Sequence, residues 1–208
     1  MKYAVQVPSL VLCLAIMNGC GAARPSKFYQ LTVPNDRISA QDPAPYPVAL
    51  LLGPITTSHL YRDDRIVYTA NGEAMGTYEY ARWAEPPSEM ICDLLLRELR
   101  SSRRYRHVYS LRSDVRGDYL LRGHLYDFRE ISGNGLAARV SFEFELRDSK
   151  TGATVWTRSY THDEPVAGKD VPAVVAALDR NAQNGLHEIT ASLEQYFVAQ
   201  ARTAPQSR

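Results

Sequence analysis

The chain has 208 residues, 45% of them hydrophobic, and its 24 basic and 23 acidic side chains give a formal net charge of +1. This length suits one domain with a sizeable core. The near balance of charge excludes the strongly basic surface of a nucleic-acid-binding protein, and no polybasic run indicates an anionic membrane surface as partner.

The first twenty residues predict a secretory signal. An almost wholly apolar run from Ala4 to Met17 follows Lys2, and it is shorter than the roughly 20 residues that a membrane-spanning helix needs. The motif Met17-Asn18-Gly19-Cys20 then resembles a bacterial lipobox, with a large apolar residue at −3, a small one at −1 and cysteine at +1. Residues 1–19 are therefore interpreted as a lipoprotein signal peptide.

The lipobox resemblance implies that Cys20 is lipidated, with a diacylglycerol on its thiol and an acyl chain such as palmitate on the new amine. Gly21 stands where an aspartate would favour inner-membrane retention in enteric-type bacteria, so we expect the periplasmic face of the outer membrane. The alternative is ordinary cleavage near Ala22 or Ala23, which would discard Cys20. In either case Cys92 has no cysteine left for an intramolecular disulfide.

Small and polar residues 20–26 predict a lipidated tether, followed by one domain over residues 27–202 and a flexible tail over 203–208. Alternation predicts a first strand over 28–33, and the proline-rich stretch 35–47 predicts a loop. Short apolar or alternating runs predict further strands over 48–52, 65–70 and 77–80, the last two around the turn-forming residues Asn71 and Gly72.

A helix is predicted to begin at Ser88, as N-cap, and to end near Ser101. Its apolar stripe comprises Met90, Ile91, Leu94, Leu95 and Leu99. Cys92 lies beside this stripe and is interpreted as a packed small side chain.

The second half of the chain predicts a strand over 105–111 and then an antiparallel meander of strands over 119–129, 140–147 and 154–160. Apolar side chains at 140, 142, 144 and 146 alternate with polar ones, so one face should be buried and the other wet. A long helix follows, with Asp170 as N-cap and its apolar phase kept across Asn184 and Gly185. The predicted fold is α+β, a single domain with a mainly antiparallel sheet and two packed helices.

No pattern of catalytic chemistry stands out. The chain has no nucleophile elbow, no phosphate-binding glycine loop and no His-Glu-x-x-His motif, and its five histidines are scattered. The acidic pairs at 63–64 and 143/145 are explained as solvated charges. The sequence therefore predicts no enzyme, no metal site and no cofactor.

Aromatic residues gather between positions 61 and 83. Amphipathic rings of this kind suit protein interfaces and the edges of lipid-binding grooves, although tyrosine is also a favoured strand residue. The cluster comprises Tyr61, Tyr68, Tyr78, Tyr80 and Trp83.

Several short motifs, in this order behind the lipobox, resemble the ABC-type transport auxiliary lipoproteins, PqiC-like proteins that are associated with MCE proteins. The motifs are Phe28-Tyr29-Gln30-Leu31, the stretches 52–55 and 60–68, Tyr78-Glu79-Tyr80, and Arg82-Trp83-Ala84-Glu85-Pro86. The resemblance continues through the hairpin that contains Trp156 and through the last helix.

The resemblance implies a non-catalytic auxiliary component of an intermembrane lipid transport system. Its partners would be an MCE-domain protein that bridges the periplasm and the components of an inner-membrane ABC transporter, with phospholipid and a homo-oligomeric ring as further expectations. We expect the partner to bind the segment 60–86. The residues predicted to take part are Tyr61, Tyr68, Tyr80, Trp83, Glu85 and Pro86.

Two other classes of function stay open. One is a lipid-binding carrier, in which the sheet and the long helix enclose a groove. The other is a structural or regulatory envelope lipoprotein that has no part in transport, such as an activator of a cell-wall enzyme.

Overall fold

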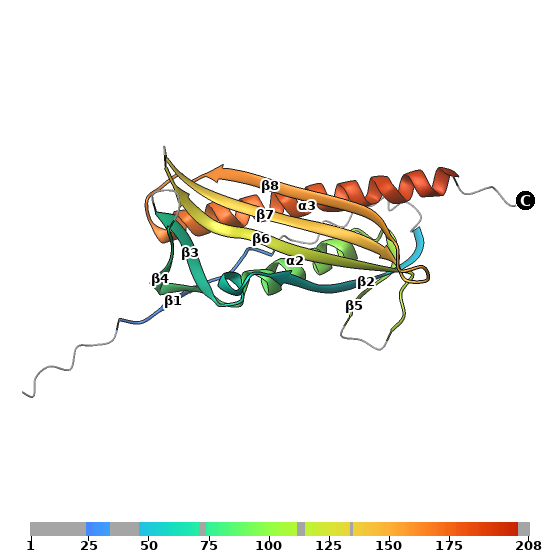
Figure 1. Ribbon diagram of the computed structural model, residues 1–208, viewed down its shortest axis with the longest axis horizontal. Coiled ribbons are helices and arrows are strands. Elements are labelled where there is room, and N and C mark those ends of the chain that lie inside the picture. The colour runs from blue at the N-terminus through green and yellow to red at the C-terminus, as the bar shows by residue number, and fades with distance from the viewer. Residues whose placement is uncertain (1–23, 34–45, 71–73, 112–114, 134, 204–208) are drawn as a thin grey trace, which may run out of the picture.

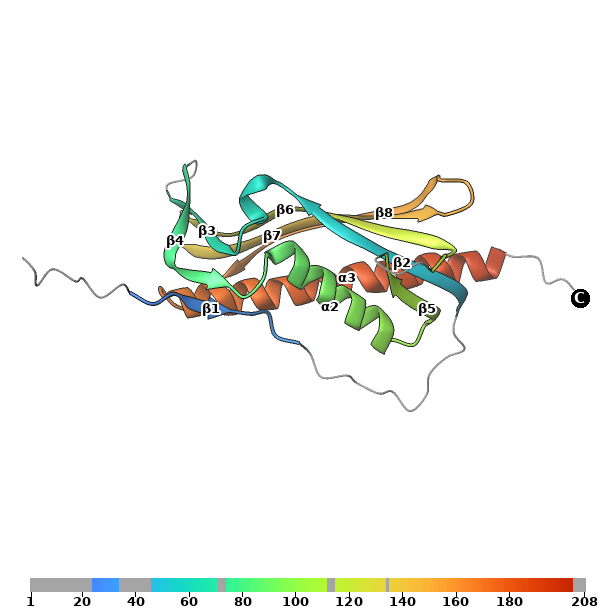
Figure 2. The ribbon, with the colours of Figure 1, turned by 90° about the horizontal axis from the view of Figure 1, so that it is seen from below.

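The computed structural model describes residues 24–33, 46–70, 74–111, 115–133 and 135–203, so the signal peptide and Cys20 lie outside the described residues. The strands are β1 (Lys27–Tyr29), β2 (Tyr46–Thr57), β3 (Arg65–Ala70), β4 (Ala74–Trp83), β5 (Tyr105–Ser110), β6 (Tyr119–Ser132), β7 (Leu136–Asp148) and β8 (Thr154–Pro165). The helical elements are the 3-10 turn η1 (His59–Tyr61), α2 (Pro87–Ser101) and α3 (Val171–Thr203). The sheet forms one layer and both α-helices cover the same face of it (Figures 1 and 2), which confirms the predicted single α+β domain.

Strand β6 organises the sheet. One of its edges pairs antiparallel with β7 from end to end, and β8 then pairs with β7, which confirms the predicted meander. The other edge is shared: Leu50–Thr57 of β2 pair with the first half of β6, and Val67–Thr69 of β3 pair with its second half. Strands β2 and β3 therefore lie one after the other along the same neighbour, with η1 between them.

The long antiparallel ladders of β6 with β7 and of β7 with β8 dominate the sheet, as predicted, but the sheet is mixed, because β2 and β3 both pair parallel with β6. Strand β5 pairs parallel with β2, and β1 pairs parallel with β4. Strands β3 and β4, which contain the predicted strands 65–70 and 77–80, pair antiparallel. The first strand is shorter than expected, because only Lys27–Tyr29 find a partner on β4.

The two helices differ in how well the sequence located their starts. The predicted cap at Ser88 is wrong: Pro86 occupies the N-cap position, and its carbonyl accepts hydrogen bonds from the backbone N–H groups of Glu89 and Met90. Prolines suit these first positions because their fixed φ matches the helix and they have no N–H to satisfy. The cap at Asp170 is confirmed, since its Oδ1 accepts the N–H of Ala173 at 3.1 Å, and α3 continues without a break to Thr203.

The core lies between the sheet and the two α-helices. The inward side chains of β7 are fully buried, as their alternation predicted, and they include Phe142 and Phe144. Leu186, Ile189 and Leu193 of α3 meet the same core. Gly185 lets the helix approach closely, because a Cβ at this position would lie 2.6 Å from the rings of Phe142 and Tyr160.

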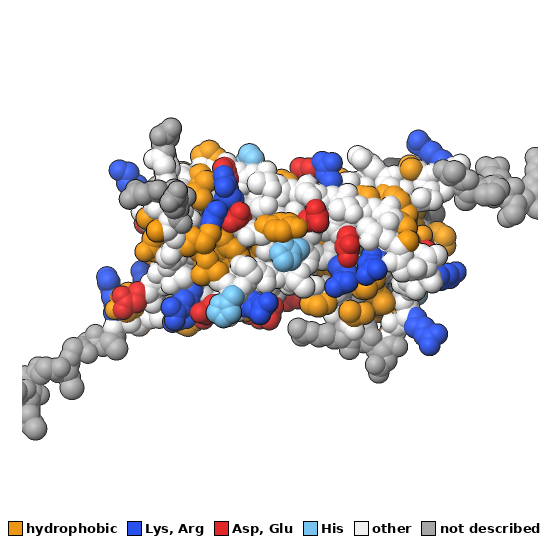
Figure 3. Space-filling view, viewed as in Figure 1, with side chains coloured by type: hydrophobic (Ala, Val, Ile, Leu, Met, Phe, Trp, Pro, Cys, Tyr) orange, Lys and Arg blue, Asp and Glu red, His pale blue; other side chains and the backbone are white. Residues whose placement is uncertain are grey.

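The face of the sheet that carries no helix is largely polar. Arg139 binds Asp163 through two hydrogen bonds of 2.7 Å, and Ser159 donates to Glu143 at 2.8 Å. Figure 3 shows this face, where charged, histidine and apolar side chains are interspersed. The meander is thus dry on one side and wet on the other, as predicted.

Candidate functional site

The segment 60–86 was predicted to bind a partner, but two of its aromatic side chains belong to the core. Trp83 is 0% exposed, and its ring lies 5.4 Å from that of Phe128. Tyr61 is 2% exposed, and its hydroxyl donates to Asp127 at 3.2 Å. A partner cannot touch either side chain without opening the fold, so we assign both residues to the core and remove them from the predicted surface.

A second pair of tyrosines is half-buried on the helix-facing side of β3 and β4. The rings of Tyr68 and Tyr78 lie 5.2 Å apart, and Gly76 leaves room for the Tyr68 ring. The Tyr78 hydroxyl donates to the buried carboxylate of Glu130 at 2.5 Å. Burial, followed by this carboxylate, raises the pKa of Tyr78 well above its ordinary value. Tyr68 therefore supports Tyr78, which in turn reaches the surface.

The remaining predicted residues do reach the surface, in two places. Tyr80 is 38% exposed, and the Arg24 guanidinium lies over its ring at 5.7 Å. Glu85 is exposed and Pro86 is half-buried where β4 gives way to α2. The structure thus brings Tyr80 and the Glu85–Pro86 turn to the same end of the sheet, but not into one continuous cluster with Tyr61 and Trp83.

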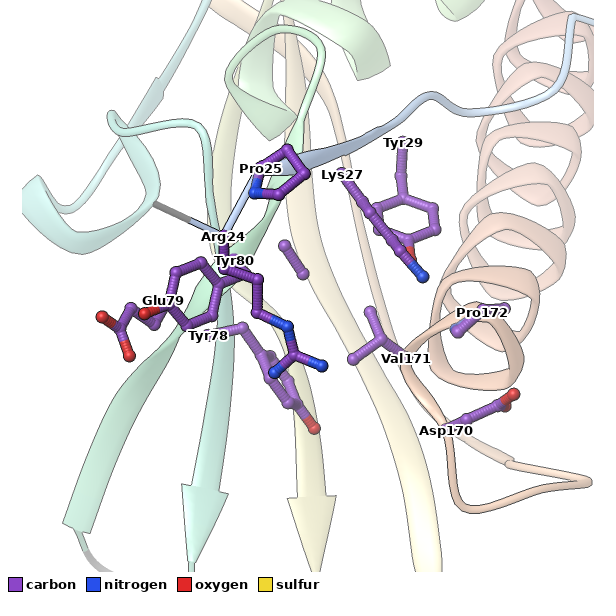
Figure 4. A pocket seen from close by; sticks show the side chains of 11 residues that line it. Arg24, Pro25, Lys27, Tyr29, Tyr78, Glu79, Tyr80, Asp170, Val171 and Pro172 are labelled. Carbon is purple, nitrogen blue, oxygen red and sulfur yellow. The ribbon is translucent and has the colours of Figure 1, made fainter. Parts of the chain in front are cut away.

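A surface hollow of about 390 Å³ opens beside Tyr80. Its walls come from three separate parts of the chain: residues just before and within β1, the middle of β4, and the start of α3 (Figure 4). They are Arg24, Pro25, Lys27, Tyr29, Tyr78, Glu79, Tyr80, Ala81, Asp170, Val171 and Pro172.

The charges around the hollow are not equivalent. Asp170 is engaged as the cap of α3, and the Glu79 carboxylate points away from the hollow in Figure 4. This carboxylate is the main cause that raises the pKa of Tyr80. Arg24 and Lys27 extend toward the space between β4 and α3, and neither has an ion-pair partner within the described part of the chain.

A second, larger hollow of about 530 Å³ separates the end of α2 from the middle of α3. Glu98 crosses it, accepting a hydrogen bond from Thr190 at 2.7 Å, with His187 3.7 Å away. Asn184 and Arg97 line the same cleft. These polar contacts tie the two helices together on the face that points away from the sheet.

Over residues 24–33, 46–70, 74–111, 115–133 and 135–203, no three His, Cys, Asp or Glu side chains gather closely enough to hold a metal ion. Cys92 is half-buried, with its Sγ 3.8 Å from the Gly53 carbonyl. None of the helices in these ranges is both long and apolar enough to cross a membrane.

Sequence reasoning missed the two cations of the hollow. Arg24 falls in the stretch that small and polar residues marked as a tether, and Lys27 begins a strand whose pairing partner lies more than fifty residues away. Their one sequence signal is that they are the two basic residues between Cys20 and Phe28. That signal gains meaning only when β1 is placed beside β4 and α3.

A family model described as the ABC-type transport auxiliary lipoprotein component matches residues 29–190. The chain belongs to this family. The match includes η1, both α-helices up to Thr190 and all strands except the beginning of β1, so the resemblance seen in the short motifs is confirmed. No curated protein matches the sequence.

Solved structures show how widely this fold is shared. Protein XCC0632 from Xanthomonas campestris, of the family DUF330, is 22% identical with a TM-score of 0.74, over 85% of this chain and 100% of its own. An uncharacterized protein is 15% identical with a TM-score of 0.64, over 82% and 99%. The hypothetical protein CT253 from Chlamydia trachomatis is 8% identical with a TM-score of 0.51, over 74% and 99%. At these identities the likeness shows a common fold.

Proposed function

We propose that this protein is a non-catalytic auxiliary component of an MCE/ABC-type intermembrane lipid transport system, anchored through Cys20 on the periplasmic face of the outer membrane. The family match over residues 29–190 carries the proposal. The lipobox motif supports the anchor, and Gly21 after the cysteine supports the outer membrane. The partners would be an MCE-domain protein that spans the periplasm and, through it, the inner-membrane transporter.

The packing favours docking over a role as a lipid carrier. A carrier needs a cavity between the sheet and the long helix, but the side chains that face each other there, such as Phe142, Phe144 and Leu193, are fully buried against one another. The two hollows described above open at the surface and reach only the margin of the core, at Ala81 in the smaller one and at Leu99 and Leu186 in the larger one. The domain is therefore suited to holding a partner, with lipid contacts restricted to its surface.

Affinity purification from solubilised envelopes, with a tag at the C-terminus, tests the proposal. We expect the native protein to carry acyl mass and to bring down an MCE-domain protein, and Cys20→Ala to lose the acyl mass and the membrane location. An acylated protein that brings down only cell-wall enzymes would show that the protein regulates the envelope instead. An unacylated protein cleaved after Ala22 or Ala23 would remove the anchor from the proposal.

The partner surface within the segment 60–86 needs a test that leaves the core intact. Ala84 is exposed on this segment, and Ala153 is an exposed alanine in the turn between β7 and β8 at the far end of the molecule. We expect Ala84→Arg to abolish recovery of the MCE-domain protein, because a long cation would obstruct the surface, while Ala153→Arg retains it. Equal recovery with both variants would place the partner elsewhere.

A further inference from the structure

The hollow beside Tyr80 combines two features that sequence alone does not connect. Arg24 and Lys27 present cationic groups without carboxylate partners in the described part of the chain, and the tyrosines Tyr29, Tyr78 and Tyr80 form apolar walls with polar rims. Tyrosine rings with one wet edge are favoured at the boundary between membrane and water. Unpaired cations beside such rings suit a phosphate group.

The position of the hollow relative to the anchor is limited by chain length. Four peptide steps separate Cys20 from Arg24, and even a fully extended chain spans at most about 14 Å over that distance. If Cys20 carries acyl chains, Arg24 is therefore held close to the lipid headgroups. This distance is comparable to the Debye length of about 8–10 Å at physiological ionic strength, so the charges act on the membrane surface.

Exposed apolar side chains at the same end support the contact. Phe28, on β1 between Lys27 and Tyr29, is 64% exposed, and Met75 on β4 is 46% exposed. Both strands are part of the sheet edge that follows directly from the N-terminal segment (Figure 2). Phe28 alternates with Lys27 and Tyr29 along β1, so its ring lies on the outer side of the same edge strand. Exposed apolar side chains at this end suit a surface that rests on a bilayer.

We propose that this hollow binds the phosphate of a phospholipid in the membrane to which the protein is tethered, with Arg24 and Lys27 as the recognising side chains. The proposal rests on the lipid anchor of the proposed function. It gives that anchor an orientation: the end of the fold with β1, β4 and the start of α3 faces the bilayer. The end of α3 then points toward the periplasm and the transport partner.

The test removes the acyl chains so that only the protein surface can bind. Residues 20–208 with Cys20→Ser contain every described element, and their sedimentation with vesicles of phosphatidylethanolamine and phosphatidylglycerol is compared in three forms. These are the parent protein, Arg24→Gln with Lys27→Gln, and Lys150→Gln with Arg202→Gln. The last pair removes the same charge from exposed positions at the other end of the molecule.

We expect the loss of Arg24 and Lys27 to weaken vesicle binding about fivefold for each cation, hence about 25-fold together. The control pair should stay within about twofold of the parent, because its charges lie beyond the screening distance. Equal losses in both double variants, or no loss in either, would overturn the proposal. So would saturable binding of inorganic phosphate, followed by NMR, in a protein that fails to bind vesicles, because the ligand would then be a free anion.

This outcome is separable from that of the proposed function. The vesicle experiment contains no transport partner, so failure of vesicle binding leaves recovery of the MCE-domain protein as an independent result. In the reverse case, vesicle binding that depends on Arg24 and Lys27 would persist even if the affinity purification brought down no MCE-domain protein.

Discussion

Asn181 is the polar residue on which the contact between α3 and the sheet depends most. It is fully buried, and its Nδ2 donates to the carbonyls of Ala138 on β7, at 2.8 Å, and His162 on β8, at 2.9 Å. Its Oδ1 accepts the Tyr160 hydroxyl at 2.7 Å. A single amide side chain thus satisfies groups from two strands inside an otherwise apolar interface, which is costly to lose.

We predict that Asn181→Leu lowers the free energy of unfolding by about 2–4 kcal/mol, because a side chain of similar size leaves these groups without hydrogen bonds. Denaturant titration measures the change. The neighbouring exposed position offers a control, since Asn184→Leu makes the same replacement in contact with solvent and should change stability by less than about 0.5 kcal/mol. Similar effects at both positions would show that the buried amide is not special.

At the scale of elements, α3 approaches the β7–β8 ladder closely at Gly185. Glycine is a poor helix former, so helix propensity alone would raise the free energy of unfolding of Gly185→Ala by roughly 1 kcal/mol. We predict instead that Gly185→Ala lowers the free energy of unfolding by about 1–2 kcal/mol in total. The new methyl group would overlap the rings of Phe142 and Tyr160 and force them apart.

Thermal or denaturant unfolding of Gly185→Ala checks this, with Asn184→Ala as the matched substitution one residue away. Asn184 is exposed, so Asn184→Ala should raise the free energy of unfolding by about 0.5 kcal/mol. If Gly185→Ala also stabilised the protein, the helix would have room to move away from the sheet, and the close packing would not limit the fold.

The burial of Trp83 belongs to the same scale, because this side chain joins β4 to β6. Its ring packs on Phe128, and its backbone N–H donates to the Asp64 carbonyl at 2.6 Å. We predict that Trp83→Ala lowers the free energy of unfolding by about 3–5 kcal/mol. Circular dichroism should detect the loss, and any failure to bind a partner would then follow from unfolding. A stable, folded Trp83→Ala protein would contradict its assignment to the core.

For the whole molecule, buried tyrosines predict a sensitivity to alkali. Burial, followed by the charge of Asp127, raises the pKa of Tyr61 from 10.0 to about 12, and burial also raises the pKa values of Tyr78 and Tyr105. A raised pKa in the folded state means that the unfolded chain loses these protons first. Stability should therefore be constant up to about pH 10 and fall as the pH rises from there toward 12.

Urea midpoints measured across this pH range test the prediction. Tyr105 is an informative control because its buried hydroxyl has no hydrogen-bond partner in the described part of the chain. Tyr105→Phe should keep or raise the midpoint at pH 7 and make the alkaline fall shallower. A fall of unchanged steepness in this variant would assign the alkaline sensitivity to other groups.

Elements whose sequence patterns are long and local were predictable without any knowledge of the fold. The alternation at 140–146 predicted which face of β7 is buried, and the helical spacing after Asp170 predicted an unbroken α3, because each pattern repeats often enough to outweigh single residues such as Gly185. The family followed from short motifs in a fixed order behind a lipobox, which also needs no tertiary information. The tertiary structure was not required for any of these inferences.

Which strands pair with one another, and which aromatic side chains stay exposed, became known only from the three-dimensional fold. Tyr61 and Tyr80 have the same chemistry in the same segment, yet one is buried by β6 and the other lies beside Arg24. The hollow likewise joins positions near 25, 80 and 170, which have no local relation. Strand pairing and burial depend on contacts between distant parts of the chain, so a local pattern predicts that a residue is amphipathic but not which of its neighbours will cover it.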